Sequence, residues 1–172
     1  MIQLRDPAAS AAVMRPKVMG TRVLERVLAD EPVEFIVLCS SLTGISGAAG
    51  QVDYCAANAY LDAFARFNSL RGTFTVSIDW DAWREAGMAV DARLPKDLAK
   101  AREQALANGL TGAEGVDVFR RCLSSALPQI LVSASGWGSD VRHVETGEAA
   151  LVPAAGASDV PLNPRPNLVV SY

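Results

Sequence analysis

Three short apolar runs, at 35–39, 73–80 and 129–134, constrain this chain more than any other feature. The first is a continuous run of Phe, Ile, Val, Leu and Cys, too short for a helix and without polar alternation. That pattern is typical of a central parallel strand covered on both faces. Helical patterns at 10–29, 51–70 and 111–127 alternate with the runs. The succession predicts βαβ units, and therefore an α/β fold with a parallel sheet.

The composition excludes several classes of function. The chain has 172 residues, 50% of them hydrophobic, which suits one domain with a buried core. A formal net charge of −3 gives no basic excess for binding nucleic acid. No apolar stretch is long enough to cross a membrane, and the first ten residues lack a signal pattern, so we expect a cytoplasmic protein. Cys39, Cys55 and Cys122 lack C-x-x-C spacing, so we expect reduced, mostly buried thiols and no metal site.

Local signals suggest where several elements begin and end. Pro16 either opens the first helix or kinks a longer one. The spacing of Thr111 and Glu114 predicts a capping box for the last helix. The glycines at 44, 47 and 50 predict a loop. Their G-x-x-G-x-x-G spacing leaves a phosphate-cradling loop as the less favoured alternative to a simple turn.

Polar residues gather where the first predicted strand ends. Ser40 and Ser41 lie at the carboxyl end of that strand, and ligands of open α/β sheets bind beyond such ends. Tyr54 and Asn58 share one face of the next helix because they are four residues apart. A serine and a tyrosine hydroxyl could hold a carbonyl oxygen, and a lysine ammonium, with Lys17 as the candidate, would favour the phenolate. The alternative is that Tyr54 is only a core aromatic with a hydrogen-bonded tip.

Four segments resemble the ketoreductase domains of modular polyketide synthases, within the short-chain dehydrogenase/reductase superfamily. They are RPKVMGTRVL at 15–24, FIVLCSS at 35–41, GQVDYCAANAYLDA at 50–63 and SIDWDAW at 77–83. The resemblance implies the C-terminal half of a Rossmann-like, doubly wound parallel sheet with helices on both faces. It divides the chain into a partial catalytic subdomain at 1–135 and a C-terminal extension with a linker at 136–172.

The resemblance also implies roles for individual residues. Ser41 matches the serine that orients the substrate carbonyl, and Tyr54 matches the proton donor. Asn58 and Lys17 match the other two members of the catalytic tetrad, in the exchanged order of polyketide ketoreductases. Lys17, Ser40 and Tyr54 are the residues expected to contact the cofactor, NADPH. The expected reaction reduces a 3-ketoacyl thioester on an acyl carrier protein to the 3-hydroxyacyl thioester, in polyketide or related fatty acid biosynthesis.

The sequence departs from the family in one respect, because the glycine-rich dinucleotide-binding half precedes the region matched here. The chain is therefore expected to be a fragment or a split product that needs the upstream half or other synthase domains, with possible self-association. The alternative function is a non-catalytic, truncated ketoreductase that serves as a structural or interaction module.

A few further residues receive structural interpretations. We expect Asp53 to face solvent and His143 to lie on the surface. Trp80 and Trp83 are expected to pack under the active-site loop, with direct contact to substrate as the alternative. The charged cluster at 96–103 is expected on an exposed helix face, with carrier-protein docking as the alternative.

Overall fold

The computed structural model describes residues 6–87, 103 and 106–134. Its elements, in chain order, are α1 (Pro7–Val27), β1 (Phe35–Ser41), α2 (Thr43–Ser46), α3 (Val52–Ser69), β2 (Phe74–Trp80), α6 (Gly112–Leu123) and β3 (Gln129–Leu131). The strands form a parallel sheet in the order β1-β2-β3. The predicted α/β fold and parallel sheet are confirmed.

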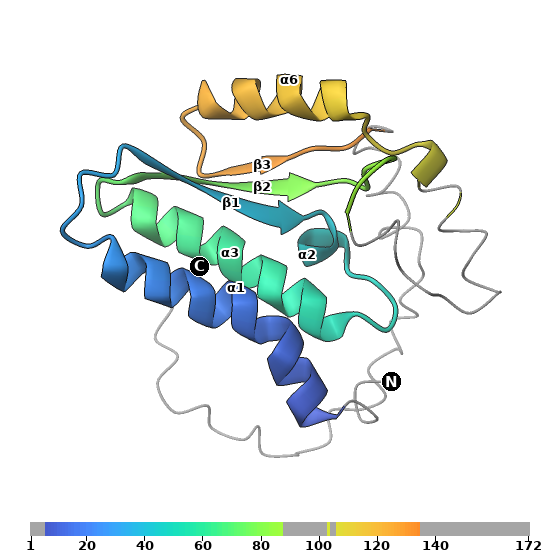
Figure 1. The fold of residues 1–172 in the computed structure, drawn as a ribbon, viewed down its shortest axis with the longest axis horizontal. Coiled ribbons are helices and arrows are strands. Elements are labelled where there is room, and N and C mark those ends of the chain that lie inside the picture. Colours follow the sequence, from blue (N-terminus) through green and yellow to red (C-terminus); the bar gives the residue numbers. More distant parts are fainter. Residues whose placement is uncertain (1–5, 88–102, 104–105, 135–172) are drawn as a thin grey trace, which may run out of the picture.

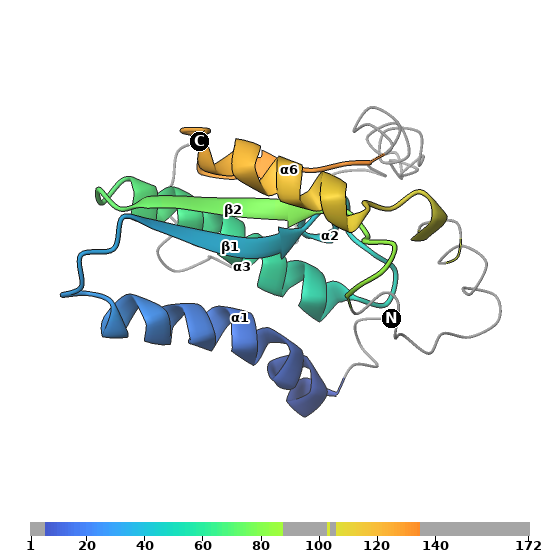
Figure 2. The same ribbon diagram turned by 45° about the horizontal axis from the view of Figure 1, so that its top comes forward.

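Helices cover both faces of this sheet (Figure 1, Figure 2). α1 and α3 lie on one side and α6 lies on the other, as predicted. The two layers have separate apolar cores. The core beside α3 contains Leu38, Leu61, Phe64 and Ala65, and the core beside α6 contains Val76, Ile78, Leu110, Cys122 and Val132.

Several element boundaries differ from the predicted ones. α1 begins at Pro7, where the Asp6 carboxylate accepts hydrogen bonds from two main-chain amides, so Pro16 lies inside a longer helix. The glycine-containing loop begins with the single turn of α2. The capping box of Thr111 and Glu114 is confirmed, but α6 ends at Leu123 rather than near 127. β3 has only three residues.

β1 is less covered than its apolar sequence predicted. It is the end strand of the described sheet, and its burial is one-sided. Leu38 and Ser40 are buried, whereas Phe35 is 47% exposed and Cys39 is also exposed. The expectations of a central strand covered on both faces, and of a buried thiol at Cys39, are therefore wrong for the described part of the chain. Cys55 is half-buried and Cys122 is buried.

β2 is the most buried strand, and its two faces differ in polarity. Its apolar side chains pack in the core beside α6. Its alternate polar side chains bond to α3 and to neighbouring strands instead. The line of polar residues between α3 and β2 is called the polar seam below. It consists of Asn58, Asp62, Asn68, Thr75, Ser77 and Asp79, all of them buried.

The segment that follows β2 pairs with the segment that precedes α6. Trp83 forms an isolated parallel bridge with Leu110, and the rings of Trp80 and Trp83 pack with their centroids 5.1 Å apart. The two tryptophans thus pack on each other, while their position under the active-site loop stays a prediction. The charged cluster at 96–103, apart from residue 103, lies outside the described residues, as do His143 and the whole of 136–172.

Candidate active site

The carboxyl end of β1, the middle of α1 and the first turns of α3 bring the predicted site residues together. Ser40 and Ser41 are the last two residues of β1. Tyr54 and Asn58 lie in the first half of α3, and the Asn58 amide nitrogen donates to the Tyr54 main-chain oxygen at 2.9 Å. Lys17 approaches from α1. Residues far apart in sequence thus meet at one end of the sheet, where α/β folds bind ligands.

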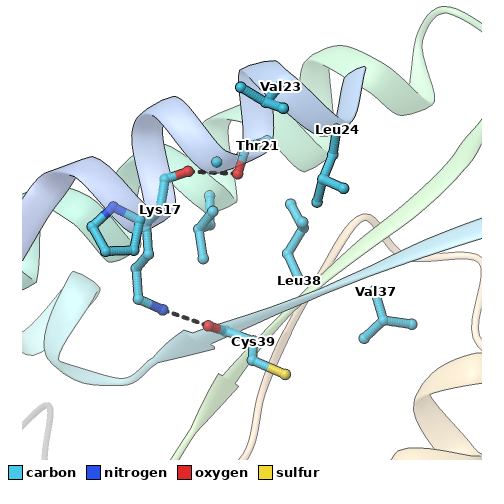
Figure 3. Close-up of a pocket in the computed structure, with 10 residues that line it drawn as sticks. Lys17, Thr21, Val23, Leu24, Val37, Leu38 and Cys39 are labelled. Carbon is cyan, nitrogen blue, oxygen red and sulfur yellow. Dashed lines mark hydrogen bonds between the residues drawn. The ribbon is translucent and has the colours of Figure 1, made fainter. Parts of the chain in front are cut away.

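Lys17 is fixed by the end of β1. Its Nζ donates to the main-chain oxygen of Cys39 at 2.6 Å (Figure 3) and lies 5.9 Å from the ring centroid of Tyr54. Burial lowers the pKa of Lys17 below its usual value, while the Cys39 thiol and the Asp62 carboxyl act in the opposite direction. The structure therefore holds a cation at the tyrosine ring, where the ring quadrupole attracts it.

The two serines at the end of β1 are oriented differently. Ser40 is buried and donates its hydroxyl hydrogen to the Asn58 main-chain oxygen at 3.3 Å. Ser41 is half-buried, and its Oγ accepts from the main-chain amide of Thr43 at 3.3 Å and from the Thr43 hydroxyl at 3.1 Å. A serine oxygen that only accepts keeps its own hydrogen for another acceptor. Among the described residues Ser41, rather than Ser40, thus keeps a hydroxyl hydrogen that it can donate to a ligand.

Tyr54 and Asn58 each keep a functional group that is not used within the described region. Tyr54 is half-buried, and no hydrogen bond among the described residues joins its hydroxyl to Ser41 or Lys17. Asn58 is completely buried, yet its Oδ1 has no hydrogen-bond partner in the described part of the chain. A buried amide oxygen without a donor costs about 1–3 kcal/mol. The site therefore offers the phenol of Tyr54, while the unpaired acceptor of Asn58 stays enclosed beneath it.

The polar seam was not predicted from the sequence. Along it, Asn68 Nδ2 donates to Thr75 Oγ1 at 2.8 Å, and Ser77 Oγ donates to Asp62 Oδ1 at 2.7 Å. The signal was the sequence TFTVSIDW, whose polar residues alternate with apolar ones on a strand that also lacks solvent exposure.

Two buried carboxyl groups beside the site were also missed. Asp79 Oδ2 accepts from Gln129 Nε2 at 2.7 Å, and burial raises the pKa of Asp79 to about 6. Asp53, expected in solvent, is 4% exposed and accepts a hydrogen bond from the main-chain amide of Tyr54, so that expectation is wrong.

A hollow between α1 and β1 adjoins the site without containing it. A cavity of about 510 Å³ lies between α1 and β1 and is lined mainly by apolar side chains, with Lys17 at one end (Figure 3). Neither Ser41 nor Tyr54 lines this cavity. We therefore place the candidate reactive site at the hydroxyl groups of Ser41 and Tyr54, and not in this cavity.

The described residues suit only part of a dinucleotide site. Lys17 and Tyr54 could contact a ribose and a nicotinamide, but the first of the three glycines after β1 is taken up by packing within the fold. Gly44 lies in the short helix α2 and packs against α3, where a Cβ would lie 3.1 Å from the Cβ of Asn58. That contact favours the turn interpretation of these glycines. No cluster of metal-ligating side chains, and no helix able to span a membrane, occurs among the described residues.

Comparisons with known proteins agree on one family. The model of the KR domain matches residues 1–85. A phenolphthiocerol/phthiocerol polyketide synthase from Mycobacterium tuberculosis is 43% identical over 110 residues, which are 62% of this chain and 6% of that protein. The polyketide synthase PksN of Bacillus subtilis is 34% identical over 126 residues, 70% of this chain and 2% of its own length. The chain thus spans a small part of these relatives.

Solved structures give the same result. The first ketoreductase of the tylosin polyketide synthase superposes with a TM-score of 0.65 at 30% identity, covering 77% of this chain and 28% of that one. A ketoreductase from the first module of phoslactomycin biosynthesis in Streptomyces sp. HK803 also superposes with a TM-score of 0.65 at 30% identity. It covers 81% of this chain and 31% of its own.

Proposed function

This chain belongs to the family of ketoreductase domains found in polyketide synthases, and we propose that it carries the proton-donating part of a ketoreductase active site. The proposed reaction reduces a 3-ketoacyl thioester, carried by an acyl carrier protein, to the 3-hydroxyacyl thioester. The hydride would come from NADPH when it is bound. The observation that carries the proposal is the position of the Lys17 ammonium at the ring of Tyr54.

In this proposal the chain's residues hold the substrate carbonyl and move one proton. Ser41 donates its free hydroxyl hydrogen to the carbonyl oxygen and orients it. Tyr54 donates its phenolic proton to the same oxygen as negative charge develops there. Lys17 stabilises the resulting phenolate by its positive charge. Asn58 fixes the first turns of α3 through its bond to the Tyr54 main-chain oxygen.

The cofactor would rest on Lys17 and Tyr54. Ser40 supports this contact less well, because its hydroxyl is buried and directed at α3. We propose that the glycine-rich half of the dinucleotide site comes from polypeptide outside this chain, and that this half also covers the outer edge of β1. β1 is the end strand of the described sheet, and Phe35 and Cys39 are exposed on one of its faces, which supports this proposal. The division into a catalytic part at 1–135 and a linker at 136–172 is part of the same proposal.

The decisive experiment replaces the proton donor in the ketoreductase assembled with its upstream half. Tyr54→Phe keeps the ring and removes the acid, so the rate with a 3-ketoacyl thioester should fall by at least about 10²-fold. NADPH binding should remain nearly unchanged. Tyr60→Phe is the matched control, because Tyr60 lies on the same helix and packs on Phe64 with ring centroids 6.4 Å apart. Retention of more than about a tenth of the rate in Tyr54→Phe would overturn the assignment.

A second candidate function is a structural module without turnover. It is favoured by one observation: Gly44, the first glycine after β1, lies in α2 and packs against α3 rather than in an open loop that could hold a phosphate. Fluorescence titration of the 172-residue chain with NADPH, alone and with the upstream half, distinguishes a ketoreductase from a structural module. We expect weak or no binding by the chain alone and restored binding with the upstream half. Binding that stays absent in the assembled protein would favour the structural module.

A further inference from the structure

We propose that Pro16 and Thr21 are positioning residues for Lys17: together they bend α1 around this lysine, and the bend directs its ammonium to the end of β1. The inference deepens the proposed function, on which it rests only in treating Lys17 as the partner of Tyr54. The geometry itself belongs to α1 and β1 and does not depend on the reaction.

α1 is not a straight helix. Both ribbon views show it bent in its N-terminal half, and the segment after the bend runs along α3 (Figure 1, Figure 2). Pro16 lies inside this helix. Proline has no amide hydrogen, so the helical bond from residue 16 to the carbonyl of residue 12 cannot form, and the ring is crowded by that carbonyl. Sharp bends of helices occur at such positions. Lys17 is the first residue past this break, so the direction of its side chain depends on it.

Core packing does not explain a proline at this position. Pro16 is exposed, so its ring buries little apolar area. A proline in a helix interior also lowers helix stability more than any other residue. What the proline changes here is therefore the course of the main chain immediately before Lys17.

Thr21 acts on the same lysine from the other side. It is the one buried residue of α1, at 6% exposure, and its hydroxyl donates to the main-chain oxygen of Lys17 at 2.6 Å (Figure 3). In a regular helix that oxygen accepts the amide hydrogen of residue 21. A threonine hydroxyl that bonds four residues back gives the same oxygen a second donor, and bonds of this kind bend helices. Departures from regular helix geometry thus flank Lys17 on both sides.

The result is seen at the tip of the Lys17 side chain. Its Nζ donates to the Cys39 main-chain oxygen at 2.6 Å and lies 5.9 Å from the ring centroid of Tyr54 (Figure 3). The stem of a lysine is flexible, so the ammonium keeps one position only when the main chain that carries it is also held. One of its three donors is used by Cys39, which orients the other two. The bend in α1 therefore sets where the ammonium stands before a ligand arrives.

The test of Pro16 measures the bond between Lys17 and Cys39 by the carbon-13 shift of the Cys39 main-chain carbonyl in the 172-residue chain. Lys17→Met removes the donor and gives the shift of the unbonded carbonyl. We expect Pro16→Ala to move the Cys39 signal toward the Lys17→Met value while raising the thermal midpoint of unfolding, because alanine favours a straight helix. A residue with only a structural role would not lose the bond while the fold gains stability.

Thr21 is tested with a pair of variants. Thr21→Val keeps the shape of the side chain and removes the hydroxyl, so the Cys39 signal should again move toward the Lys17→Met value. Thr21→Ser restores the hydroxyl and should return the signal to the wild-type value. Ser124→Ala is the matched control, because Ser124 Oγ donates to the Arg120 main-chain oxygen at 3.1 Å, a bond of the same kind on α6. It should leave the Cys39 signal unchanged.

In the assembled protein, Pro16→Ala and Thr21→Val should move the pH–rate profile in the same direction as Lys17→Met. A Cys39 signal that is equal in the wild type and in Lys17→Met would overturn the inference, since the bond would then be absent in solution. An unchanged signal in Pro16→Ala or in Thr21→Val would overturn the role of that residue. If Thr21→Val does not fold, Thr21→Ala, a stronger helix former, takes its place. The carbonyl signal needs no turnover, so failure here is distinct from failure of the Tyr54 assay.

Discussion

The Nζ of Lys17 lies 5.9 Å from the ring centroid of Tyr54 while donating a 2.6 Å hydrogen bond to the main-chain oxygen of Cys39. One lysine thus joins α1 to both β1 and α3. The hydrogen bond sets the position of the ammonium before any ligand arrives, so its effect on the tyrosine is built into the fold.

Lys17→Met should impair ketoreduction by the assembled protein and move its pH–rate profile to higher pH. Methionine keeps the length of the side chain but removes the charge that favours the phenolate. The substitution also removes the hydrogen bond to the Cys39 main-chain oxygen. If the ammonium contacts the ribose of the cofactor, cofactor affinity should fall as well. Steady-state rates across pH and a cofactor titration measure both effects. Arg22→Met, an exposed cation on the same helix, is the control. An unshifted profile with normal affinity would make Lys17 a surface residue.

Asp79 should make the unfolding free energy of the chain depend on pH. Because its pKa is raised from 3.8 to about 6, the folded state holds a proton that the unfolded state has lost between these values. Stability is therefore greatest below about pH 4 for this group and falls as pH rises to about 6, by up to about 3 kcal/mol. Asp79→Asn should remove this slope. Urea unfolding at a series of pH values tests it, and a slope that persists in the variant would assign it to another group.

Gly115 of α6 should not tolerate a side chain. A Cβ at this position would overlap the indole ring of Trp83, which lies against the helix there. Gly115→Ala should therefore destabilise the chain by about 1–3 kcal/mol, the usual cost of overpacking. Tryptophan fluorescence should change as the ring moves. Gly20→Ala on α1 is the matched control, because no atom lies within 4 Å of its added Cβ. Equal effects of both variants would show that helix propensity, and not the ring, decides.

The outer edge of β1 should make the chain alone self-associate, because unpaired strand edges pair with one another. Phe35 is 47% exposed on one face of this end strand, where a second chain pairing with the edge would cover it, so Phe35→Lys should shift sedimentation toward the monomer. Phe67→Lys replaces a phenylalanine of similar exposure, 53%, on α3 and should not have this effect. A wild-type chain that sediments as a monomer at all concentrations would contradict the prediction.

Local patterns predicted the elements well. The apolar run of β1, the capping box at Thr111 and the alternation of strands with helices each depend on neighbours in sequence, so the parallel sheet followed directly. The exposure of Phe35 could not be predicted, because an apolar run does not reveal which polypeptide covers it. Pro16 lies inside α1 because the Asp6 cap starts the helix earlier than its apolar periodicity suggests.

The site was predicted in part. The spacing of Tyr54 and Asn58 placed both on α3, and Lys17 does approach them, although the catalytic and cofactor roles stay predictions. The burial of Asp53 and Asp79 was not foreseen, since an acidic side chain is usually exposed. Gln129, the partner of Asp79, is on β3, and no local pattern connects the two residues.

The polar seam has a consequence for the uniqueness of the fold. Apolar side chains between a helix and a sheet can often slide by a turn at small cost, because any methyl group packs tolerably against another. Ser77 to Asp62 and Asn68 to Thr75 are specific pairs, and a slip of one turn would leave all four groups buried without partners. Competing alignments of α3 on the strand are therefore raised in energy, so one alignment is selected, and the helix that carries Tyr54 is held in that alignment.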